Sequence, residues 1–163
     1  MAKEPVKKQL ISINHTVAEN RRARFDYFLE EIFEAGIMLT GTEVKSLRHG
    51  QCSLNESYVM IKNGDVTITG VYIAPYGTAG THLQHDARRY RKLLLHKREM
   101  AKLSAATKQK GYTIVPVKLY FNGRGLAKVT IALAKGKAEH DKRQTIKERD
   151  WSRDKSRILR GEE

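Results

Sequence analysis

Two pairs of β-rich runs, each joined by an Asn-Gly dipeptide, constrain the fold of this chain more than any other feature. The first pair is SYVMIK and DVTITGVYI, joined by Asn63-Gly64, and the second is YTIVPVKLYF and LAKVTIALA, joined by Asn122-Gly123-Arg124-Gly125. Asn-Gly between such runs is the strongest short-range signal for a tight β-hairpin, because both residues tolerate positive φ. The chain is therefore expected to contain an antiparallel sheet built around two hairpins.

The second hairpin shows which side chains face the core. One face of its first strand is expected to carry Val115, Val117, Leu119 and Phe121, and one face of its second strand Ala127, Val129, Ile131 and Leu133. Pro116 points to the other face and cannot donate a ladder hydrogen bond. The first strand is therefore expected to lie at a sheet edge or to contain a bulge.

The spacing of apolar residues along the sequence and the local composition predict the remaining helices and strands. Phe25, Phe28, Leu29, Ile32 and Phe33 recur at the helical period, which predicts a helix near residues 22–35 that ends at Gly36. The run IMLTGTEVKSLR (37–48) is rich in β-branched residues and is expected to be extended, with a further possible strand near residues 9–14. Met100, Leu103 and Ala106 predict a short helix near 96–109 that ends before Gly111.

This order of elements favours a mainly β protein with flanking helices. A small antiparallel barrel with a helix inserted between its strands is the arrangement of the OB-fold, whose usual ligands are oligonucleotides and oligosaccharides. We expect residues 1–17 to be a flexible N-terminal segment that includes the possible first strand, residues 18–134 to be an OB-fold-like antiparallel β-barrel, and residues 135–163 to be a basic C-terminal tail.

The charge of the chain points to a polyanionic partner. Lys and Arg total 31 against 18 Asp and Glu, which leaves a net charge of +13. Two clusters are dense: Arg21, Arg22 and Arg24 near the first expected helix, and the run from Arg88 to Arg98, which contains no acidic residue. Tyr27, Tyr76 and Tyr90 lie close to these clusters and could stack on bases, although half-buried aromatic residues are equally expected there. Together these features favour nucleic-acid binding over a merely solvated surface.

The tail carries much charge and few apolar residues. If it were helical, Lys142, Arg149, Arg153 and Arg160 would lie on one narrow stripe, with Trp151 almost opposite. An isolated helix of this length is marginal in water, and the tail has too few apolar residues to cover the barrel. We therefore expect a tail that is disordered in the free protein and becomes helical against RNA.

Several other functions are not expected. No segment reaches the roughly 18 apolar residues of a membrane span, and the first residues lack the apolar region of a secretory signal, so a cytoplasmic protein without a membrane partner is expected. The single cysteine, Cys52, excludes an internal disulfide and is expected to be a semi-buried residue without chemistry. His82, His85 and Asp86 share one loop but lack further ligands at recognisable spacing, so no metal, cofactor or catalytic residue is expected.

Three segments resemble a known family. They are NRRARFDYFLEEIFEAGIMLTGTEVKSLRHG, HDARRYRKLLLH and AKGKAEHDKRQTIKERDW, and the resemblance extends from about Asn20 to Leu159. The chain resembles the SmpB family, the SsrA-binding proteins of bacterial trans-translation. One departure is Ala87, which stands where the family commonly has proline.

The resemblance implies a function and a set of partners. A member of this family binds the tRNA-like domain of tmRNA (SsrA RNA) and supports its delivery, with EF-Tu and GTP, to a stalled 70S ribosome. Its tail would enter the decoding centre, formed by 16S rRNA, and the empty mRNA channel, so that the stalled chain is tagged for degradation and the ribosome is released. Alanyl-tRNA synthetase would be an indirect partner, DNA would not be a partner, and the protein would be a cofactor of the process and not an enzyme.

The resemblance and the basic clusters also imply site residues. The expected tmRNA-binding residues are Asn20, Arg22, Tyr27, Glu34, Arg89, Arg91, Lys92 and Leu94. The expected ribosome-binding residues of the tail are Gly136, Lys137, His140, Asp141, Lys142, Arg143, Lys147, Arg149, Trp151, Arg153, Ile158 and Leu159.

Two alternatives belong to other classes. A basic ribosomal or ribosome-assembly protein with an OB barrel would share the composition and the fold. An RNA-processing enzyme would use the loop from His82 to Asp86 for chemistry.

Overall fold

The protein is described here by a computed structural model that covers residues 14–161. In chain order the elements are β1 (His15–Glu19), α1 (Ala23–Asp26), β2 (Tyr27–Ile37), α2 (Gly41–Arg48), β3 (Cys52–Ser53), β4 (Tyr58–Lys62), β5 (Asp65–Thr69), β6 (Tyr72–Ile73), a 3₁₀ turn (Thr81–Leu83), β7 (Arg91–Leu94), α3 (Lys97–Thr107), β8 (Tyr112–Phe121), β9 (Ala127–Gly136) and α4 (Glu139–Arg160). The possible strand near residues 9–14, and the expected flexibility of most of residues 1–17, concern a segment that lies largely outside the described residues.

The main sheet closes on itself. Its strand order is β1-β8-β4-β5-β7-β2-β9, all pairs are antiparallel, and a further pairing of β8 with β9 completes the ring. The OB-fold-like antiparallel barrel expected from the sequence is confirmed. Because β1 pairs with β8 from His15 onward, the sheet begins before the boundary that we expected at residue 18.

Both predicted hairpins are present. β4 and β5 pair along their length across a turn in which Asn63 and Gly64 have φ of 52° and 79°. β8 and β9 form the longer hairpin, and its register shifts between Pro116 and Lys118, so the bulge predicted around this proline is confirmed.

This bulge corrects one prediction about the core. Leu119 and Phe121 face the main core with Ile114, whereas Val115 and Val117 face a second, smaller cluster on the outside of the barrel. The four apolar side chains of β8 therefore do not share one face. The extra residue at the bulge inverts the alternation between Val117 and Leu119.

Two predictions of secondary structure are wrong: one segment predicted to be a helix is mostly a strand, and one predicted to be extended contains a helix. Residues 27–37 form a strand, β2, and the helix predicted near 22–35 is reduced to the single turn of α1. β2 exposes Phe28 and Ile32, by 48% and 60%, while Phe33 is buried, and these outward-facing apolar side chains give the segment the spacing of a helix. Residues 41–48, expected to be extended, form α2, which begins with a capping box between Thr40 and Glu43.

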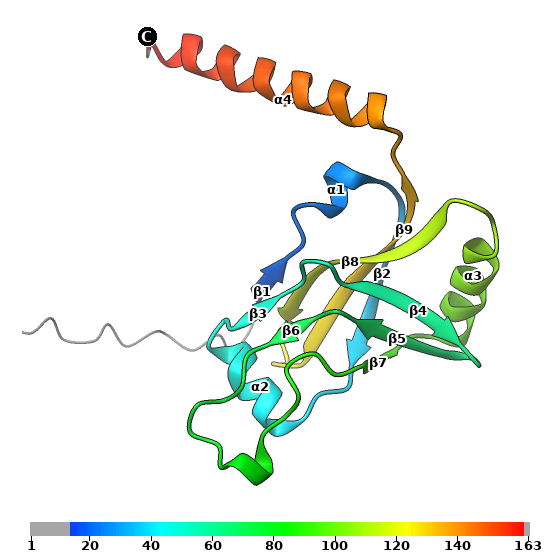
Figure 1. Cartoon of the computed structure of the whole chain (residues 1–163), viewed down its shortest axis with the longest axis vertical. Coiled ribbons are helices and arrows are strands. Elements are labelled where there is room, and N and C mark those ends of the chain that lie inside the picture. Colours follow the sequence, from blue (N-terminus) through cyan, green and yellow to red (C-terminus); the bar gives the residue numbers. More distant parts are fainter. Residues whose placement is uncertain (1–13, 162–163) are drawn as a thin grey trace, which may run out of the picture.

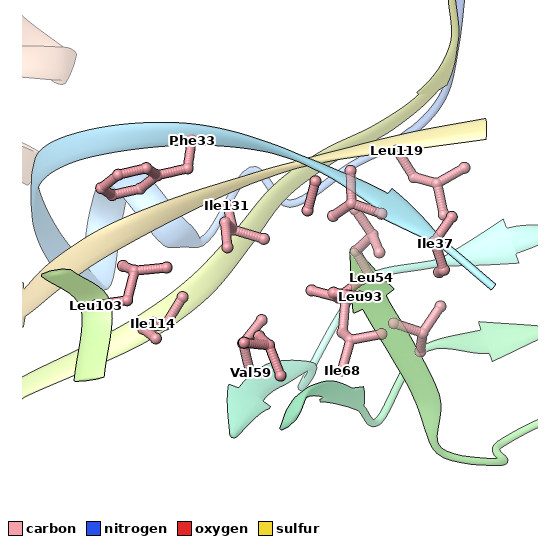
Figure 2. Close-up of a cluster of buried hydrophobic side chains, with 14 of the residues drawn as sticks. Phe33, Ile37, Leu54, Val59, Ile68, Leu93, Leu103, Ile114, Leu119 and Ile131 are labelled. Atoms are coloured by element: carbon pink, nitrogen blue, oxygen red, sulfur yellow. The ribbon is translucent and has the colours of Figure 1, made fainter. Parts of the chain in front are cut away.

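The core fills the barrel. Phe33, Leu93, Ile114 and Ile131 come from four different strands and meet inside the ring, as Figure 2 shows. Leu103 of α3 is fully buried against them, so the helix predicted near 96–109 is present and packs onto the barrel. Cys52 is half-buried, as expected, and burial raises the pKa of its thiol to about 12.

The tail has the helical conformation that we expected against RNA. Residues Glu139–Arg160 form the continuous helix α4, and disorder of this segment in the free protein stays a prediction. Acidic residues occupy its first turn, basic residues its last, and Gly161 caps its end in the left-handed conformation, all of which stabilise a helix. None of the residues from Glu139 to Arg160 is buried, and α4 extends away from the barrel (Figure 1).

Candidate RNA-binding surface

A buried charge cluster organises the densest basic run. Glu43 of α2 lies between two arginines, with its Oε1 atom 2.8 Å from both Arg89 Nε and Arg91 Nε and its Oε2 atom 2.7 Å from Arg89 Nη2. The Thr40 backbone N–H donates a fourth hydrogen bond to Oε2 at 2.8 Å. This carboxylate therefore fixes the loop that leads into β7 against the start of α2.

The hydrogen bonds and ion pairs among Glu43, Arg89 and Arg91 influence the pKa of each group. Burial favours the neutral carboxyl, but the hydrogen bonds from Arg89 and Thr40 and the charge of Arg91 together lower the pKa of Glu43. The hydrogen bond to Glu43 raises the pKa of Arg89, whereas burial lowers that of Arg91. All three groups are therefore ionised at neutral pH.

Arg91 does not have the role that the sequence indicated. Its side chain is 0% exposed, and its guanidinium donates to the carbonyl oxygens of Val71, Arg89 and Ala87 as well as to Glu43. A guanidinium without free donors cannot bind a phosphate. The expectation of direct tmRNA contact by Arg91 is corrected: this residue shapes the loop that presents Arg89.

The two predicted residues that follow on β7 point outward. Arg91 and Leu93 are buried and Lys92 and Leu94 exposed, as the two-residue period of a strand requires. Lys92 pairs with Asp65 at 2.6 Å in an exposed ion pair. Leu94 is 53% exposed and helps to line a hollow of about 400 Å³, together with Leu126 and Lys128 of the β8–β9 hairpin.

A second hollow, of about 380 Å³, brings three predicted residues together beside α1. Asn20, Arg22 and Tyr27 line it with Asp26 and Tyr58. Asn20 is nearly buried, and its Nδ2 atom donates to the Pro116 carbonyl oxygen at 3.2 Å, so it holds α1 against the bulge of β8. Arg22 is exposed at the rim and Tyr27 is half-buried, which leaves both accessible to a ligand.

Glu34 lies on the outer face of β2, in a third hollow of about 520 Å³ that Arg24 and Lys118 also line. It accepts a hydrogen bond from the Tyr120 hydroxyl and pairs with Lys128 at 3.7 Å. Burial and the bond to Glu34 raise the pKa of Tyr120 to about 12, so the hydroxyl remains a donor. Glu34 thus orients an aromatic ring and a lysine on a surface that could receive RNA.

Five of the predicted tmRNA-binding residues line these three hollows, whereas Arg89, Arg91 and Lys92 line none of them. The five lie along β2 and its neighbours. Sequence reasoning missed Tyr58, Leu126 and Lys128, which line the hollows. The outward positions of Tyr58 in β4 and Lys128 in β9 follow from strand alternation, but the sequence gives no sign that they approach the other residues.

The base of the tail is attached to α1. The Lys137 backbone N–H donates to the Asp26 carbonyl oxygen at 3.0 Å, and its Nζ atom donates to the Arg24 carbonyl oxygen at 3.0 Å. Lys142 Nζ lies 3.5 Å from Asp26 Oδ1, and the Arg149 guanidinium lies over the Phe25 ring at 5.5 Å. These contacts place the first predicted tail residues against the barrel.

The far half of α4 presents its side chains to solvent. Trp151 is 73% exposed, and Ile158 and Leu159 are each 78% exposed. Because α4 is a continuous helix, Arg153 stands one turn after Arg149, as the stripe predicted from helical pitch requires. His140 is paired with the neighbouring Asp141 at 3.0 Å, and Arg143 lies 3.9 Å from Glu139. Gly136 ends β9, and Lys147 is exposed.

The histidine loop is structural. The two ring nitrogens of His85 contact Thr42 Oγ1 at 2.9 Å and the Ile73 carbonyl oxygen at 3.1 Å, which ties the loop to α2 and β6. His82 is exposed in the 3₁₀ turn, away from these contacts. Among residues 14–161, no group of three or more His, Cys, Asp or Glu side chains could hold a metal ion. The same residues include no helix that is long and apolar enough to cross a membrane.

A basic OB-fold-like barrel with Arg, Lys and Tyr along its surface hollows, and with a charged helix extending from it, defines a nucleic-acid-binding protein of the OB class. Comparisons with known proteins place the chain within this class. The model of the SmpB protein family matches residues 17–161. The chain belongs to the SmpB family.

Curated relatives and a solved structure agree with this assignment. The SsrA-binding protein of Caulobacter vibrioides is 56% identical over 146 residues, which cover 90% of this chain and 95% of the relative. The SsrA-binding protein of Sphingomonas elodea is 59% identical over 145 residues, covering 89% and 90%. A solved chain described as "tmRNA-SmpB: a journey to the center of the bacterial ribosome" is 48% identical, with a TM-score of 0.63 and coverage of 78% of this chain and 92% of that one.

Proposed function

We propose that this chain binds the tRNA-like domain of tmRNA and acts with it in trans-translation on stalled ribosomes. Family membership supports this function, since the relatives are SsrA-binding proteins and the solved neighbour is described as tmRNA-SmpB on the bacterial ribosome. The main observation behind the proposal is that the molecule consists of two parts, a folded barrel and a separate helix. A folded barrel presents surface hollows that basic and acidic residues line together, and a separate charged helix, none of whose residues from Glu139 to Arg160 is buried, extends from it.

The barrel binds tmRNA in this proposal. Arg22 and Arg89 supply positive charge for phosphates, and Tyr27 offers an accessible ring for stacking. Leu94 offers an exposed apolar surface in the hollow beside Lys128. Lys92 adds charge on the same strand as Leu94, and Glu34, which lines the third hollow, orients Tyr120 and Lys128. Asn20 and Arg91 act through the positions of these groups, because both are buried.

The tail binds the ribosome in this proposal. Lys142, Arg149 and Arg153 face rRNA phosphates, and His140 approaches the bases of the decoding centre. The remaining predicted tail residues line the path through the decoding centre and the empty mRNA channel. Large apolar side chains are exposed on this charged helix at Trp151, Ile158 and Leu159. Such exposure is typical of a binding surface, and it supports a ribosomal partner for the tail.

The proposal assigns the remaining partners by family resemblance. EF-Tu with GTP delivers the tmRNA complex, and alanyl-tRNA synthetase charges the tmRNA, so both partners act through the RNA. The protein supplies binding and positioning and no covalent chemistry. Its place of action is the cytoplasm, where ribosomes translate.

Truncation tests the division of labour between barrel and tail. A chain that ends after Lys137 keeps β9 and the hydrogen bond from Lys137 to Asp26, so the barrel retains its end. We expect this variant to bind tmRNA with an affinity within about threefold of the full chain, and to lose tagging in a reconstituted system of stalled ribosomes. Loss of both activities to the same extent would refute two separate surfaces and favour one continuous RNA-binding surface, as in a ribosome-assembly protein.

A further inference from the structure

The outer face of α3 carries only positive charge. The side chains of this helix that are exposed to solvent are all basic or small, and they are Lys97, Arg98, Ala101, Lys102, Ala105 and, at the C-cap, Lys108. At about 100° per residue these positions cover less than half of the helix circumference, opposite the fully buried Leu103. α3 therefore presents one continuous basic face, with two alanines between the cations.

The one acidic residue of α3 does not lie on this face. Glu99 is half-buried, and its Oε2 atom accepts a hydrogen bond from the His96 backbone N–H at 3.0 Å as part of a capping box. Because the cap uses this carboxylate, it does not neutralise the exposed cations. Among residues 14–161, Lys102 is the one cation of the basic face that has an ion-pair partner, which is Glu31 at 2.5 Å.

The stability of the helix does not explain the positions of these cations. Lys97 and Arg98 lie in the first turn of α3, where the helix dipole disfavours positive charge. The last turn, where the dipole favours positive charge, has no basic residue. A negatively charged partner explains this placement better than helix stability does.

α3 is separate from the three surface hollows of the barrel, because no residue of α3 lines any of them. The chain that follows α3 lies instead beside the base of the tail. The Gly136 backbone N–H donates to the Gly111 carbonyl oxygen at 3.5 Å, and Tyr112 pairs with Lys135 across the sheet. Lys108, three residues before Gly111, is thus close to the point where the chain leaves the barrel (Figure 1).

We propose that the outer face of α3 binds the phosphate backbone of structured ribosomal RNA. Lys97 and Lys108 are 11 residues apart, which is about 16 Å along the helix, so the face can contact more than one phosphate. Ala101 and Ala105 have short side chains, and they leave room for a sugar–phosphate chain between the cations.

The choice of ribosomal RNA over tmRNA follows from the position of α3, outside the hollows and beside the start of the tail. This choice rests on the proposed function, in which the hollows bind tmRNA and the segment that begins at Gly136 enters the ribosome. The barrel would then contact the ribosome through α3 as well as through its tail.

The salt dependence of ribosome binding tests the proposal. The test variant is the full chain with Arg98→Gln and Lys108→Gln, which removes two charges of the face and introduces residues that favour a helix. The matched control, Arg48→Gln with Lys62→Gln, lowers the net charge equally at exposed positions outside α3. Each protein, in complex with tmRNA, is bound to stalled 70S ribosomes between about 50 and 200 mM salt.

The slope of log affinity against log salt is the expected readout. Two lost phosphate contacts should lower the magnitude of this slope by about 1.4 to 1.8 in the test variant, and the control should keep the slope of the unaltered chain. Exchanging the two residues, with Arg98→Lys and Lys108→Arg, retains both charges and should retain the slope. An unchanged slope in the test variant, or an equal decrease in the control, would overturn the proposal.

A second variant probes the face without removing a cation. Ala101→Glu places a carboxylate between the basic side chains at an exposed helical position, where Glu is well tolerated. Repulsion from RNA phosphates should weaken ribosome binding severalfold, whereas circular dichroism and the urea midpoint should stay unchanged. Normal ribosome binding by this variant would contradict a contact between the face and RNA.

Binding to the isolated tRNA-like domain of tmRNA distinguishes the two RNA sources. The variant with Arg98→Gln and Lys108→Gln should bind this RNA with unaltered affinity and slope, because α3 lies outside the hollows. A decrease in the tmRNA slope equal to the decrease measured with ribosomes would overturn the assignment to ribosomal RNA. Failure of the proposed function would appear differently, as an absence of tmRNA binding by the unaltered chain.

Discussion

Replacing Glu43 with Gln is expected to destabilise the barrel severely, although it changes only one atom of the side chain. The carboxylate accepts hydrogen bonds from Arg89, Arg91 and the Thr40 backbone, and it is fully buried. The amide of Gln keeps one acceptor oxygen but turns an N–H₂ group toward an arginine. The guanidinium of Arg91, itself 0% exposed, would then lie in the interior without a negative partner.

The magnitude follows from the burial of the pair. Removing one partner of a buried ion pair costs about 3 to 5 kcal/mol of unfolding free energy, because the other charge remains desolvated. The whole domain is expected to have only about 5 to 15 kcal/mol. For a chain of this size, each kcal/mol lowers the melting temperature by about 2 to 4 °C, so a loss of about 10 °C is expected.

Urea unfolding followed by circular dichroism measures the effect. The matched control is Glu31→Gln, which removes the same charge from an exposed ion pair with Lys102 and should cost less than about 1 kcal/mol. An equal, small effect of both substitutions would refute the account of Glu43. Adding Arg91→Met to Glu43→Gln should recover part of the lost stability, because the unpaired buried charge is then absent.

The pH dependence of unfolding gives a check on the same carboxylate. The pKa of Glu43 is lowered in the folded protein, so its contribution is fully present above the pKa of the unfolded state, near 4.3. This contribution is lost as the pH falls from there through the lower folded value. The difference in unfolding free energy between the unaltered protein and Glu43→Gln should therefore shrink in acid, as titrations of the urea midpoint would show.

Three other results are expected. Gly70→Ala should cost more than about 1 kcal/mol in urea unfolding, because Gly70 has a φ of +78° and an added Cβ would lie 2.6 Å from a main-chain oxygen, whereas Gly123→Ala should be nearly neutral. Cys52 should react with iodoacetamide at pH 8 at least about 100-fold more slowly in the folded than in the unfolded chain, because its pKa is raised to about 12. Arg22→Ala should lower the slope of log tmRNA affinity against log salt by about 0.7 to 0.9 in filter binding, and Lys62→Ala should not change it.

The barrel could be predicted from the sequence because its hairpins carry local signals. Asn63-Gly64 specifies a turn through two residues in positive φ, and the alternation in β9 specifies a face. β2 could not be predicted in the same way. Its outward-facing Phe28 and Ile32 are apolar, which hides the alternation of a strand, and the pairing with β9 that stabilises the strand involves residues about a hundred positions away.

The sequence did contain one local signal that we interpreted wrongly. Thr40-Gly41-Thr42-Glu43 is a capping box, and it predicts the start of α2 despite the β-branched residues nearby. The same Glu43 also shows why the basic run could not be assigned from charge alone. Its burial between Arg89 and Arg91 depends on the packing of α2 against β7, so the sequence could not distinguish the arginine in the interior from the one at the surface.

The attachment of α4 gives the molecule a mechanical property. A helix of 22 residues is about 33 Å long, and its contacts with α1 end at Arg149, about halfway along it. It therefore acts as a lever: Leu159 lies about 26 Å beyond Lys142, so a rotation of about 10° about Lys142 moves Leu159 by about 4 to 5 Å. A change in Phe25 or Asp26 of α1 is therefore expected to displace the exposed apolar side chains at the far end of α4, which lie well beyond any contact with the barrel.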